Sequence, residues 1–188
     1  IEDLVTVMAE KTSKQSPAPE RLVLDAYNKI LTLCARIELN PENRESIRTI
    51  LAQGIEFNKL IEKATWQRLH SLVAFHLSSP DFQDLVPEQV RAQFRQIRLN
   101  AMARNMLLQD ELARLLKLFQ QANVPVVVLK GSALLGTVYQ DISLRPMGDL
   151  DILVNPHHLD LTESVALREG YQYLPIKESK KEHHHLPE

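Results

Sequence analysis

Two acidic residues, Asp149 and Asp151, are separated by one position in the run RPMGDLDILV. The positions that alternate with them hold the apolar residues Leu150, Ile152 and Val154. This alternation predicts a β-strand with one buried face, and it places both carboxylates on the other face, about 6–7 Å apart along the chain. Two like charges at that distance repel each other. The pattern therefore needs a well-solvated face, one protonated carboxylate or a cation between the two.

A turn that could bind an anion precedes this run. In VVVLKGSALLG, a β-branched segment leads into Gly131 and Ser132 and then into a helix-compatible segment. Glycine lets the backbone approach a ligand, Ser132 can cap the helix, and the free N–H groups of the first helical turn attract anions. The order Lys-Gly-Ser is not that of a P-loop, and the run is not a GxSxG nucleophile elbow.

The turn and the aspartate pair predict more together than either does alone. By itself, the turn is compatible with ordinary tight-turn chemistry, and the pair with the solvated face of an edge strand. Asp149 follows Gly131 by eighteen residues, so a phosphate-binding turn and a metal-binding face are expected side by side. Magnesium that bridges carboxylates and phosphate oxygens is what polyphosphate-dependent transfer chemistry requires.

The stretch KGSALLGTVYQDISLRPMGDLDILV resembles the hG[GS] and DhDh signature of the DNA-polymerase-beta-like nucleotidyltransferase superfamily. It is more closely similar to a bacterial family described as uncharacterised nucleotidyltransferase. In that family a long helical N-terminal region leads into KGxAL, then a tyrosine, then RxxxDxDxLV. The similarity covers most of the chain from about residue 21, and it is specific between Pro125 and Val154.

This resemblance implies an enzyme that uses Mg²⁺ or Mn²⁺ to transfer a nucleoside monophosphate from an NTP. The acceptor would be a hydroxyl or amine on an unknown small molecule or protein. The resemblance makes Asp149 and Asp151 the catalytic, metal-binding carboxylates. It makes the following residues nucleotide-binding: Gly131, Ser132, Lys130 and Arg145. For the two basic residues we expect neutralisation of triphosphate charge, although both are also compatible with plain solvation.

The superfamily also uses a third carboxylate on a later strand, and the sequence places none there. The predicted strand GYQYLPI has no acidic residue, and the final segment KEHHHLPE offers only Glu182 and Glu188. From Val124 to Glu188 there are 65 residues, fewer than the complete catalytic fold needs. We therefore expect the nucleotidyltransferase-like part to be truncated at its C-terminus. His183 and His185 could form an H-x-H pair, but a polar strand or loop is the favoured interpretation.

Hydrophobic periodicity predicts how these residues are positioned. Apolar residues at helical spacing predict helices over residues 21–39, 41–53 and 57–77, and over a segment of more than thirty residues from Glu88. That last segment is one long helix or two nearly collinear ones with a bend at Arg104 and Asn105. Strands are predicted in VPVVVL, GDLDILV and GYQYLPI, with helical segments between them.

The resulting fold class is α+β, with a helical N-terminal domain followed by a nucleotidyltransferase-fold mixed sheet with flanking helices. We expect a tail and linker over residues 1–20, the helical domain over residues 21–122 and the nucleotidyltransferase-like domain over residues 123–188. The long apolar stripes are interpreted as a helical core.

Composition narrows the classes of partner. A formal net charge of −2 gives no general attraction to nucleic acid or anionic lipid, so nucleic acid is disfavoured as a partner. No apolar run approaches the ~20 residues of a membrane span, and no signal peptide opens the chain. The single cysteine, Cys34, lies in an apolar run and is expected to be buried. We expect a cytoplasmic protein without a membrane partner.

Two other classes of function stay open at this point. One is a degenerate nucleotide-binding or regulatory module that keeps the turn without turnover. The other is a helical interaction protein in which the α/β part serves as scaffold. Loss of the third carboxylate would favour the first, and an absence of metal and nucleotide binding would favour the second.

Overall fold

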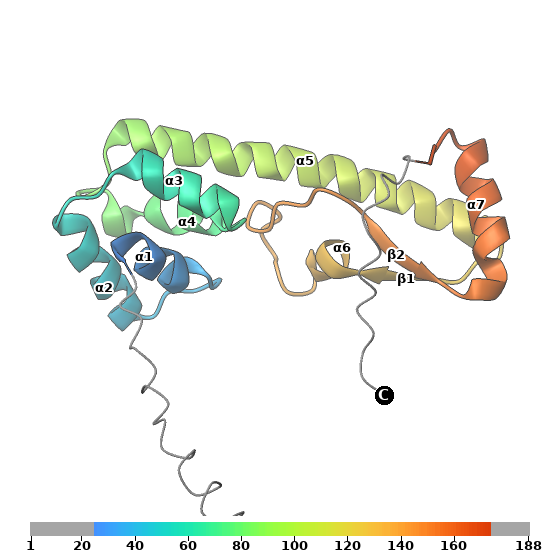
Figure 1. The fold of residues 1–188 in the computed structure, drawn as a ribbon, viewed down its shortest axis with the longest axis horizontal. Helices are drawn as coiled ribbons and strands as arrows, with labels where there is room; N and C mark the ends of the chain where they lie inside the picture. The colour runs from blue at the N-terminus through green and yellow to red at the C-terminus, as the bar shows by residue number, and fades with distance from the viewer. Residues whose placement is uncertain (1–24, 174–188) are drawn as a thin grey trace, which may run out of the picture.

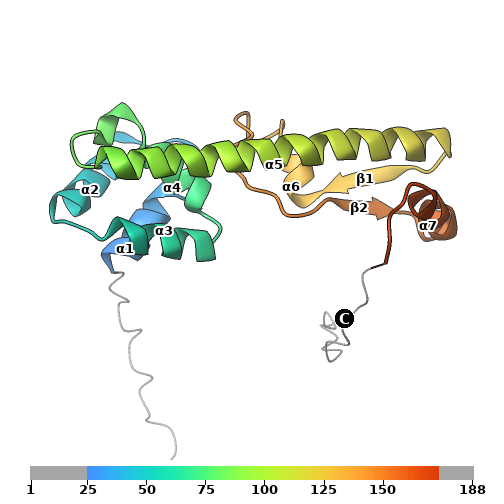
Figure 2. The same ribbon diagram turned by 90° about the horizontal axis from the view of Figure 1, so that it is seen from above.

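One long helix organises the part of the chain that the structure describes, residues 25–173 of a computed structural model. This helix, α5 (Glu88–Gln121), carries a group of short helices at one end and a β-hairpin with a further helix at the other (Figures 1 and 2). Its first half packs against α4, and its last turns pack against α7. The architecture is α+β, as the sequence predicts.

Four short helices form the N-terminal group: α1 (Ala26–Cys34), α2 (Pro41–Ala52), α3 (Phe57–Trp66) and α4 (His70–Leu77). A short 3-10 turn, η2 (Pro80–Phe82), connects them to α5. Their starts follow from local chemistry, because Asp25 caps α1 and Asn40 caps α2 with Pro41 at its first position. The buried core of this group contains Ile30, Leu31, Cys34, Ile47, Leu60, Leu77, Phe82 and Phe94.

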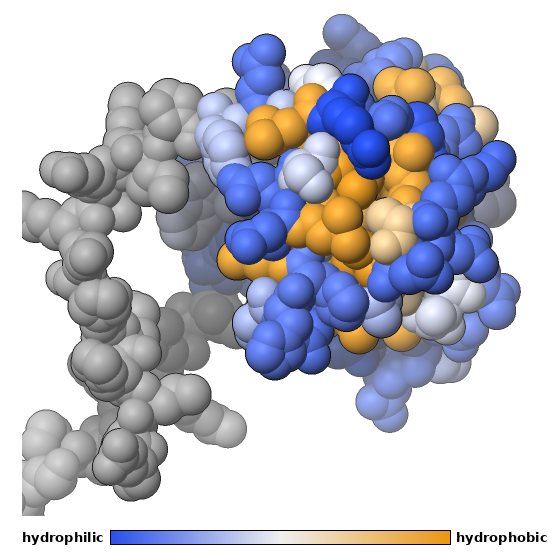
Figure 3. Space-filling model, turned by 90° about the vertical axis from the view of Figure 1, so that its right-hand side faces the viewer, coloured by the Kyte–Doolittle hydropathy of each residue, from blue (hydrophilic) through white to orange (hydrophobic). Residues whose placement is uncertain are grey.

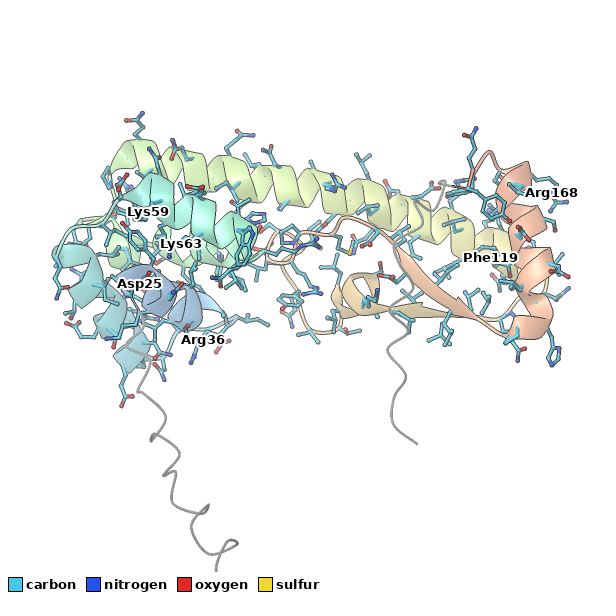
Figure 4. All side chains as sticks on the ribbon, in the orientation of Figure 1. Asp25, Arg36, Lys59, Lys63, Phe119 and Arg168 are labelled. Atoms are coloured by element: carbon cyan, nitrogen blue, oxygen red, sulfur yellow. The ribbon has the colours of Figure 1, made fainter. Side chains whose placement is uncertain are left out.

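Polar contacts add to this core at its edge. The ammonium of Lys63 on α3 lies 3.1 Å from the carboxylate of Asp25, at the start of α1. Lys59 and Lys63 both lie over the ring of Tyr27, at 5.3 and 5.5 Å from its centroid. Figure 4 shows Asp25, Lys59 and Lys63 between α1 and α3. Cys34 is fully buried as expected, and burial raises the pKa of its thiol to about 12.

The predicted single helix over residues 57–77 is wrong, because it is two helices with a break at residues 67–69. Arg68 has a left-handed backbone (φ 58°), which stops α3 and redirects the chain into α4. No glycine or proline marks this break, so the sequence pattern does not reveal it. The predicted first helix is also shorter among the described residues, since α1 ends at Cys34.

The helix α5 is a single helix of 34 residues, one of the two predicted forms. It continues through Arg104 and Asn105, where the interrupted apolar stripe indicates a bend. These two residues have another role, because both side chains bind the loop that leads to Asp149.

The hairpin consists of β1 (Val126–Leu129) and β2 (Asp151–Val154), which pair antiparallel in a register that sets Leu129 opposite Asp151. A helix of five residues, α6 (Lys130–Leu134), follows β1 directly. Ile152 and Val154 of β2, with Leu150 just before it, face the core as predicted. They pack on a buried cluster of Leu115, Phe119, Val124 and Val165. Figure 4 shows Phe119 in the part of α5 that faces α7.

The predicted third strand is wrong over the residues that can be checked. Residues 171–173 follow α7 (Leu159–Arg168) without strand pairing, while residues 174–176 lie outside the described part. The helix α7 itself matches the predicted helical segment and follows a short 3-10 turn, η3 (Pro156–His158). Residues 1–20, Glu182, Glu188 and the three histidines from His183 also lie outside the described part.

Exposed apolar side chains gather at the α7 end of the molecule, with hydrophilic residues around them (Figure 3). They include Leu159, Leu167 and Tyr173, which are 56%, 48% and 66% exposed. Within residues 25–173, none of the helices is both long and apolar enough to cross a membrane.

Candidate functional site

Five of the six site residues predicted from the sequence line one small pocket of about 180 Å³. The pocket lies where the loop between α6 and β2 meets the start of α6, and the turn after α3 completes it. Its lining residues are Arg68, Lys130, Gly131, Arg145, Pro146, Met147, Gly148, Asp149 and Asp151. Arg68 comes from the helical group and is not among the residues predicted from the sequence.

The pairing of the two strands brings opposite charges together in this pocket. Leu129 pairs with Asp151, so Lys130 follows at the end of the hairpin and its ammonium lies 2.8 Å from the Asp151 carboxylate. The hydrogen bond to Asp151 and that residue's charge raise the pKa of Lys130, with a smaller contribution from Asp149. Two neighbouring carboxylates need a positive charge close to them. In this structure the ammonium of Lys130 supplies that charge to Asp151.

The two aspartates differ in their environments. Asp151 is the first residue of β2 and is half-buried, whereas Asp149 precedes the strand and is exposed. The prediction that both lie within one strand is therefore wrong for Asp149. Both nevertheless line the same pocket, as the prediction of a shared carboxylate face requires.

Asn105 holds the loop that carries Arg145 and Asp149. This fully buried side chain donates to the carbonyl oxygens of Ile142 (2.6 Å) and Arg145 (2.8 Å), and its oxygen accepts from the N–H of Met147 (3.0 Å). Three bonds to the loop backbone fix its path on both sides of Arg145.

Two arginines of α5 add to this attachment. Arg104 donates to the carbonyl oxygens of Met147 (2.8 Å) and Gly148 (3.2 Å), immediately before Asp149. One turn and a half earlier, Arg98 donates to the carboxylate of Asp141 (2.8 Å). The helix thus holds the loop from Asp141 to Gly148, the residue before Asp149.

Asp141 begins the attached segment of the loop. Its burial alone would raise the pKa of its carboxyl, but hydrogen bonds from Ser143 and the charge of Arg98 lower that pKa on balance. The Oγ of Ser143 in turn accepts from Arg98, at 3.2 Å, and Ser143 is fully buried. The only sequence signal for these contacts was the polar interruption of the α5 stripe, which we interpreted as a bend.

The glycine of the predicted phosphate turn also has a packing role. A Cβ at Gly131 would lie 3.2 Å from the side-chain Cγ and Sδ of Met147, so glycine is what lets the loop approach α6. Ser132 lies within α6 and does not line the pocket, and its Oγ is 3.8 Å from the sulfur of Met147. The prediction that Ser132 caps this helix is wrong, because the helix begins at Lys130 without a side-chain cap.

Arg145 is oriented by an aromatic ring. Its guanidinium lies 5.9 Å from the centroid of Tyr139, and its Nε is buried without a hydrogen-bond partner among the described residues. That nitrogen would lie 3.7 Å from a Cβ at Gly131. The side chain is therefore held across the start of α6, beside Lys130.

The donor set suits a hard divalent cation that arrives with a phosphate ligand. Within residues 25–173, no three His, Cys, Asp or Glu side chains gather as a complete metal site. Magnesium is commonly held by one or two carboxylates together with substrate phosphates, and the pair Asp149 and Asp151 fits that pattern. The third carboxylate is not found in this part of the chain, and both of its candidates lie outside it.

A larger pocket of about 590 Å³ lies between α4 and the α1–α2 connection. Two arginines line it, but both are paired: Arg44 lies 2.9 Å from Asp81, and Arg98 lies 2.8 Å from Asp141. The two arginines of this larger pocket are thus already neutralised. In the smaller pocket only Lys130 and Asp151 form an ion pair among the described residues, which leaves Arg68, Arg145 and Asp149 without one. We regard the smaller pocket as the candidate site for that reason.

Comparison with known proteins gives one match. A family model described as uncharacterised nucleotidyltransferase matches residues 53–188, which includes the whole candidate site and the helices from α3 onward. No curated protein and no solved structure matches the chain.

Proposed function

The chain belongs to the uncharacterised nucleotidyltransferase family, and we propose that the pocket around Asp149 and Asp151 is its nucleotide site. There it would transfer a nucleoside monophosphate from an NTP to a hydroxyl or amine of an acceptor molecule. The observation that carries this proposal is the convergence of two carboxylates with Lys130 and Arg145 in one small pocket.

The charges of the pocket match the charges of the substrate. A triphosphate is strongly negative, and Lys130 and Arg145 supply positive charges to the pocket that Gly131 also lines. Because α6 has only five residues, its dipole is weak, and we assign phosphate binding to these side chains rather than to the helix start. Ser132 stays a proposed nucleotide-binding residue on the family pattern alone.

The carboxylates of Asp149 and Asp151 would hold a divalent cation, Mg²⁺ or Mn²⁺, against the phosphates of the bound NTP. Such a cation, when bound, supplies charge neutralisation at the reacting phosphate. The ammonium of Lys130 leaves Asp151 in that state and binds a phosphate oxygen instead. Its exposed, flexible side chain, 70% accessible, permits this move.

In the proposed reaction the acceptor oxygen or nitrogen attacks the α-phosphorus. A bond from that atom to phosphorus forms, the bond between the α-phosphorus and the bridging oxygen breaks, and pyrophosphate leaves. The proton of the acceptor passes to a base, which we do not assign within residues 25–173. The attached loop contributes by keeping Arg145 and Asp149 in place before substrate binds.

A second candidate is a nucleotide-binding module without turnover. Two observations favour it. The ammonium of Lys130 already pairs with the carboxylate of Asp151, and the described residues supply no third carboxylate to the site. Both candidates predict nucleotide binding at the same pocket. Only the transferase should move label from an α-labelled NTP to an acceptor molecule of a cell extract.

Calorimetric titration tests the site shared by both candidates. The chain would be titrated with α,β-imido analogues of the four NTPs, in which the bond that the proposed reaction breaks is replaced. The titrations would be run with and without magnesium, beside the double variant Asp149→Asn with Asp151→Asn. The control is Asp160→Asn, which removes one exposed carboxylate from the first turn of α7. Magnesium-dependent binding that the double variant loses and the control keeps supports the proposal. Equal affinity in all three proteins contradicts it.

A further inference from the structure

The turn between α3 and α4 contributes a side chain to the pocket from an unusual backbone conformation. The N–H of Arg68 donates to the carbonyl of Thr65 (3.0 Å), and the N–H of Leu69 donates to that of Ala64 (2.7 Å). This pair of bonds is the Schellman arrangement, whose left-handed position is usually glycine. At that position Arg68 has φ 58°.

Two other helices of the same chain end in the same way with residues that suit the conformation. After α5 the left-handed residue is Asn123 (φ 56°), and after α7 it is Gly170 (φ 88°). Asparagine and glycine adopt this region readily, whereas the Cβ of other residues crowds the following carbonyl. Arginine at position 68 therefore does not serve the turn itself.

What Arg68 does provide is a third cation for the pocket. Lys130, another lining residue, is also left-handed, with φ 51°. Strained residues of this kind cluster at ligand-binding sites, because the surrounding fold must hold them in place for a purpose other than stability. Two positively charged side chains with left-handed backbones, from different segments of the chain, thus line one pocket, and this arrangement suits the binding of an anion.

Trp66 lies close in sequence to Arg68, which lines the pocket. It is the single tryptophan of the chain and the last residue of α3, and it is 85% exposed. Only Gln67 lies between it and Arg68, so the Cα atoms of Trp66 and Arg68 are at most about 7.6 Å apart. Figure 1 shows this end of α3 directed toward the loop between α6 and β2. A large aromatic face left in solvent beside an anion site is suited to stack on a nucleobase.

The size of the pocket makes a second binding surface necessary. At about 180 Å³ it is smaller than the roughly 300–1,000 Å³ typical of sites that enclose a whole ligand. Phosphates fit inside it, and the nucleoside must lie against a neighbouring surface. The family match begins at residue 53, so α3 and its final turn belong to the region that defines the family.

We propose that the α3–α4 turn is the second half of the nucleotide site. Arg68 binds the phosphates opposite Lys130 and Arg145, and Trp66 stacks on the base. This inference rests on the proposed function and extends it to the base and to the helical group. Because stacking tolerates any base, the site accepts all four NTPs, and purines bind more tightly than pyrimidines.

The single tryptophan makes the test direct. Emission from Trp66 would be followed while magnesium and an imido analogue of ATP are added, with calorimetry on the same samples. We expect saturable quenching with the same midpoint as the calorimetric curve. Trp66→Ala should weaken binding at least fivefold and Arg68→Gly about tenfold. The matched control Arg36→Ala removes one exposed arginine beyond α1, away from the pocket, and should leave the affinity unchanged (Figure 4).

The outcomes separate this inference from the proposed function. Calorimetric binding with unchanged Trp66 emission, or with unchanged affinity in either variant, overturns the inference and leaves the proposed function intact. Absence of calorimetric binding overturns both. Arg68→Gly relieves a strained backbone, so its melting temperature should not fall, and weaker binding in a protein of equal or higher stability reports the lost contact rather than misfolding.

Discussion

The ammonium of Lys130 lies 2.8 Å from the carboxylate of Asp151, and the pairing of Leu129 with Asp151 in the hairpin puts it there. The sequence raised the question of how two carboxylates could share one surface, and this contact answers it for the free protein. A divalent cation at the aspartates must compete with this ammonium. The first prediction follows from that competition.

Lys130→Met should change metal binding and nucleotide binding in opposite directions. Without the ammonium, Asp151 is free, and Mn²⁺ alone should bind up to about fivefold more tightly, the scale of an exposed ion pair. The Mn²⁺–nucleotide complex should bind less tightly, because a phosphate contact is lost. Calorimetry with Mn²⁺, with and without nucleotide, measures both. A variant in which both affinities fall would contradict the competition.

Asn105→Ala should destabilise the protein and weaken the site together. The substitution removes three hydrogen bonds and leaves buried loop groups unpaired, a loss of about 2–4 kcal/mol in the free energy of unfolding. Asn100→Ala, an exposed position on the same helix, should change stability by less than about 0.5 kcal/mol. Urea denaturation compares the two, and similar losses in both variants would contradict the anchoring role.

Arg68→Gly should stabilise the fold by about 1 kcal/mol, because it removes the Cβ from a left-handed residue. The reciprocal change, Gly170→Ala after α7, should cost about 1 kcal/mol for the same reason. Thermal and urea unfolding test both. If Arg68→Gly is the less stable protein, the backbone at this turn is not strained in the way described.

Acid should destabilise the helical group through His76. Burial lowers the pKa of this histidine, although a hydrogen bond between its Nε2 and the carbonyl of Arg36, at 2.8 Å, opposes the shift, and the charges of Arg36 and Arg44 lower it further. Above the ordinary pKa of 6.5, His76 is neutral in both states and costs nothing. Below it, the unfolded chain takes up a proton first, so the free energy of unfolding falls as pH drops.

The variant His76→Gln should flatten this fall in stability below about pH 6.5. His70, which burial also shifts to lower pKa, leaves part of the slope in place. The exposed His157→Gln is the control and should keep the original slope. Denaturation curves at several pH values give the comparison, and an unchanged slope in His76→Gln would contradict the assignment.

Much of the fold follows from periodicity and capping. The α+β class, the long helix, the hairpin strands and the apolar face of β2 were predictable, because alternation and helical spacing report burial directly. Five predicted site residues meet in one pocket for a related reason: the strand that precedes the Gly131 turn pairs with the strand that follows Asp149.

Other features depend on contacts that a sequence pattern does not encode. The break at Arg68 has no glycine or proline to mark it, and the helix after it, α4, packs against the distant α5. In the sequence, Arg104 and Asn105 only interrupt an apolar stripe. In the structure, both bind a loop more than forty residues further along the chain. For Ser132 the sequence predicted a cap that the structure does not have, since α6 begins at Lys130, three residues before the start that a cap at Ser132 would set.

The most direct test of the central claim is electron paramagnetic resonance of Mn²⁺ titrated with an imido NTP analogue, in the presence of the chain and of its Asp149→Asn, Asp151→Asn variant. We expect nucleotide to increase Mn²⁺ binding to the chain, and we expect the double variant to lose this increase while it stays folded. Nucleotide-dependent Mn²⁺ binding of equal strength in both proteins would place the metal away from Asp149 and Asp151 and overturn the proposed site.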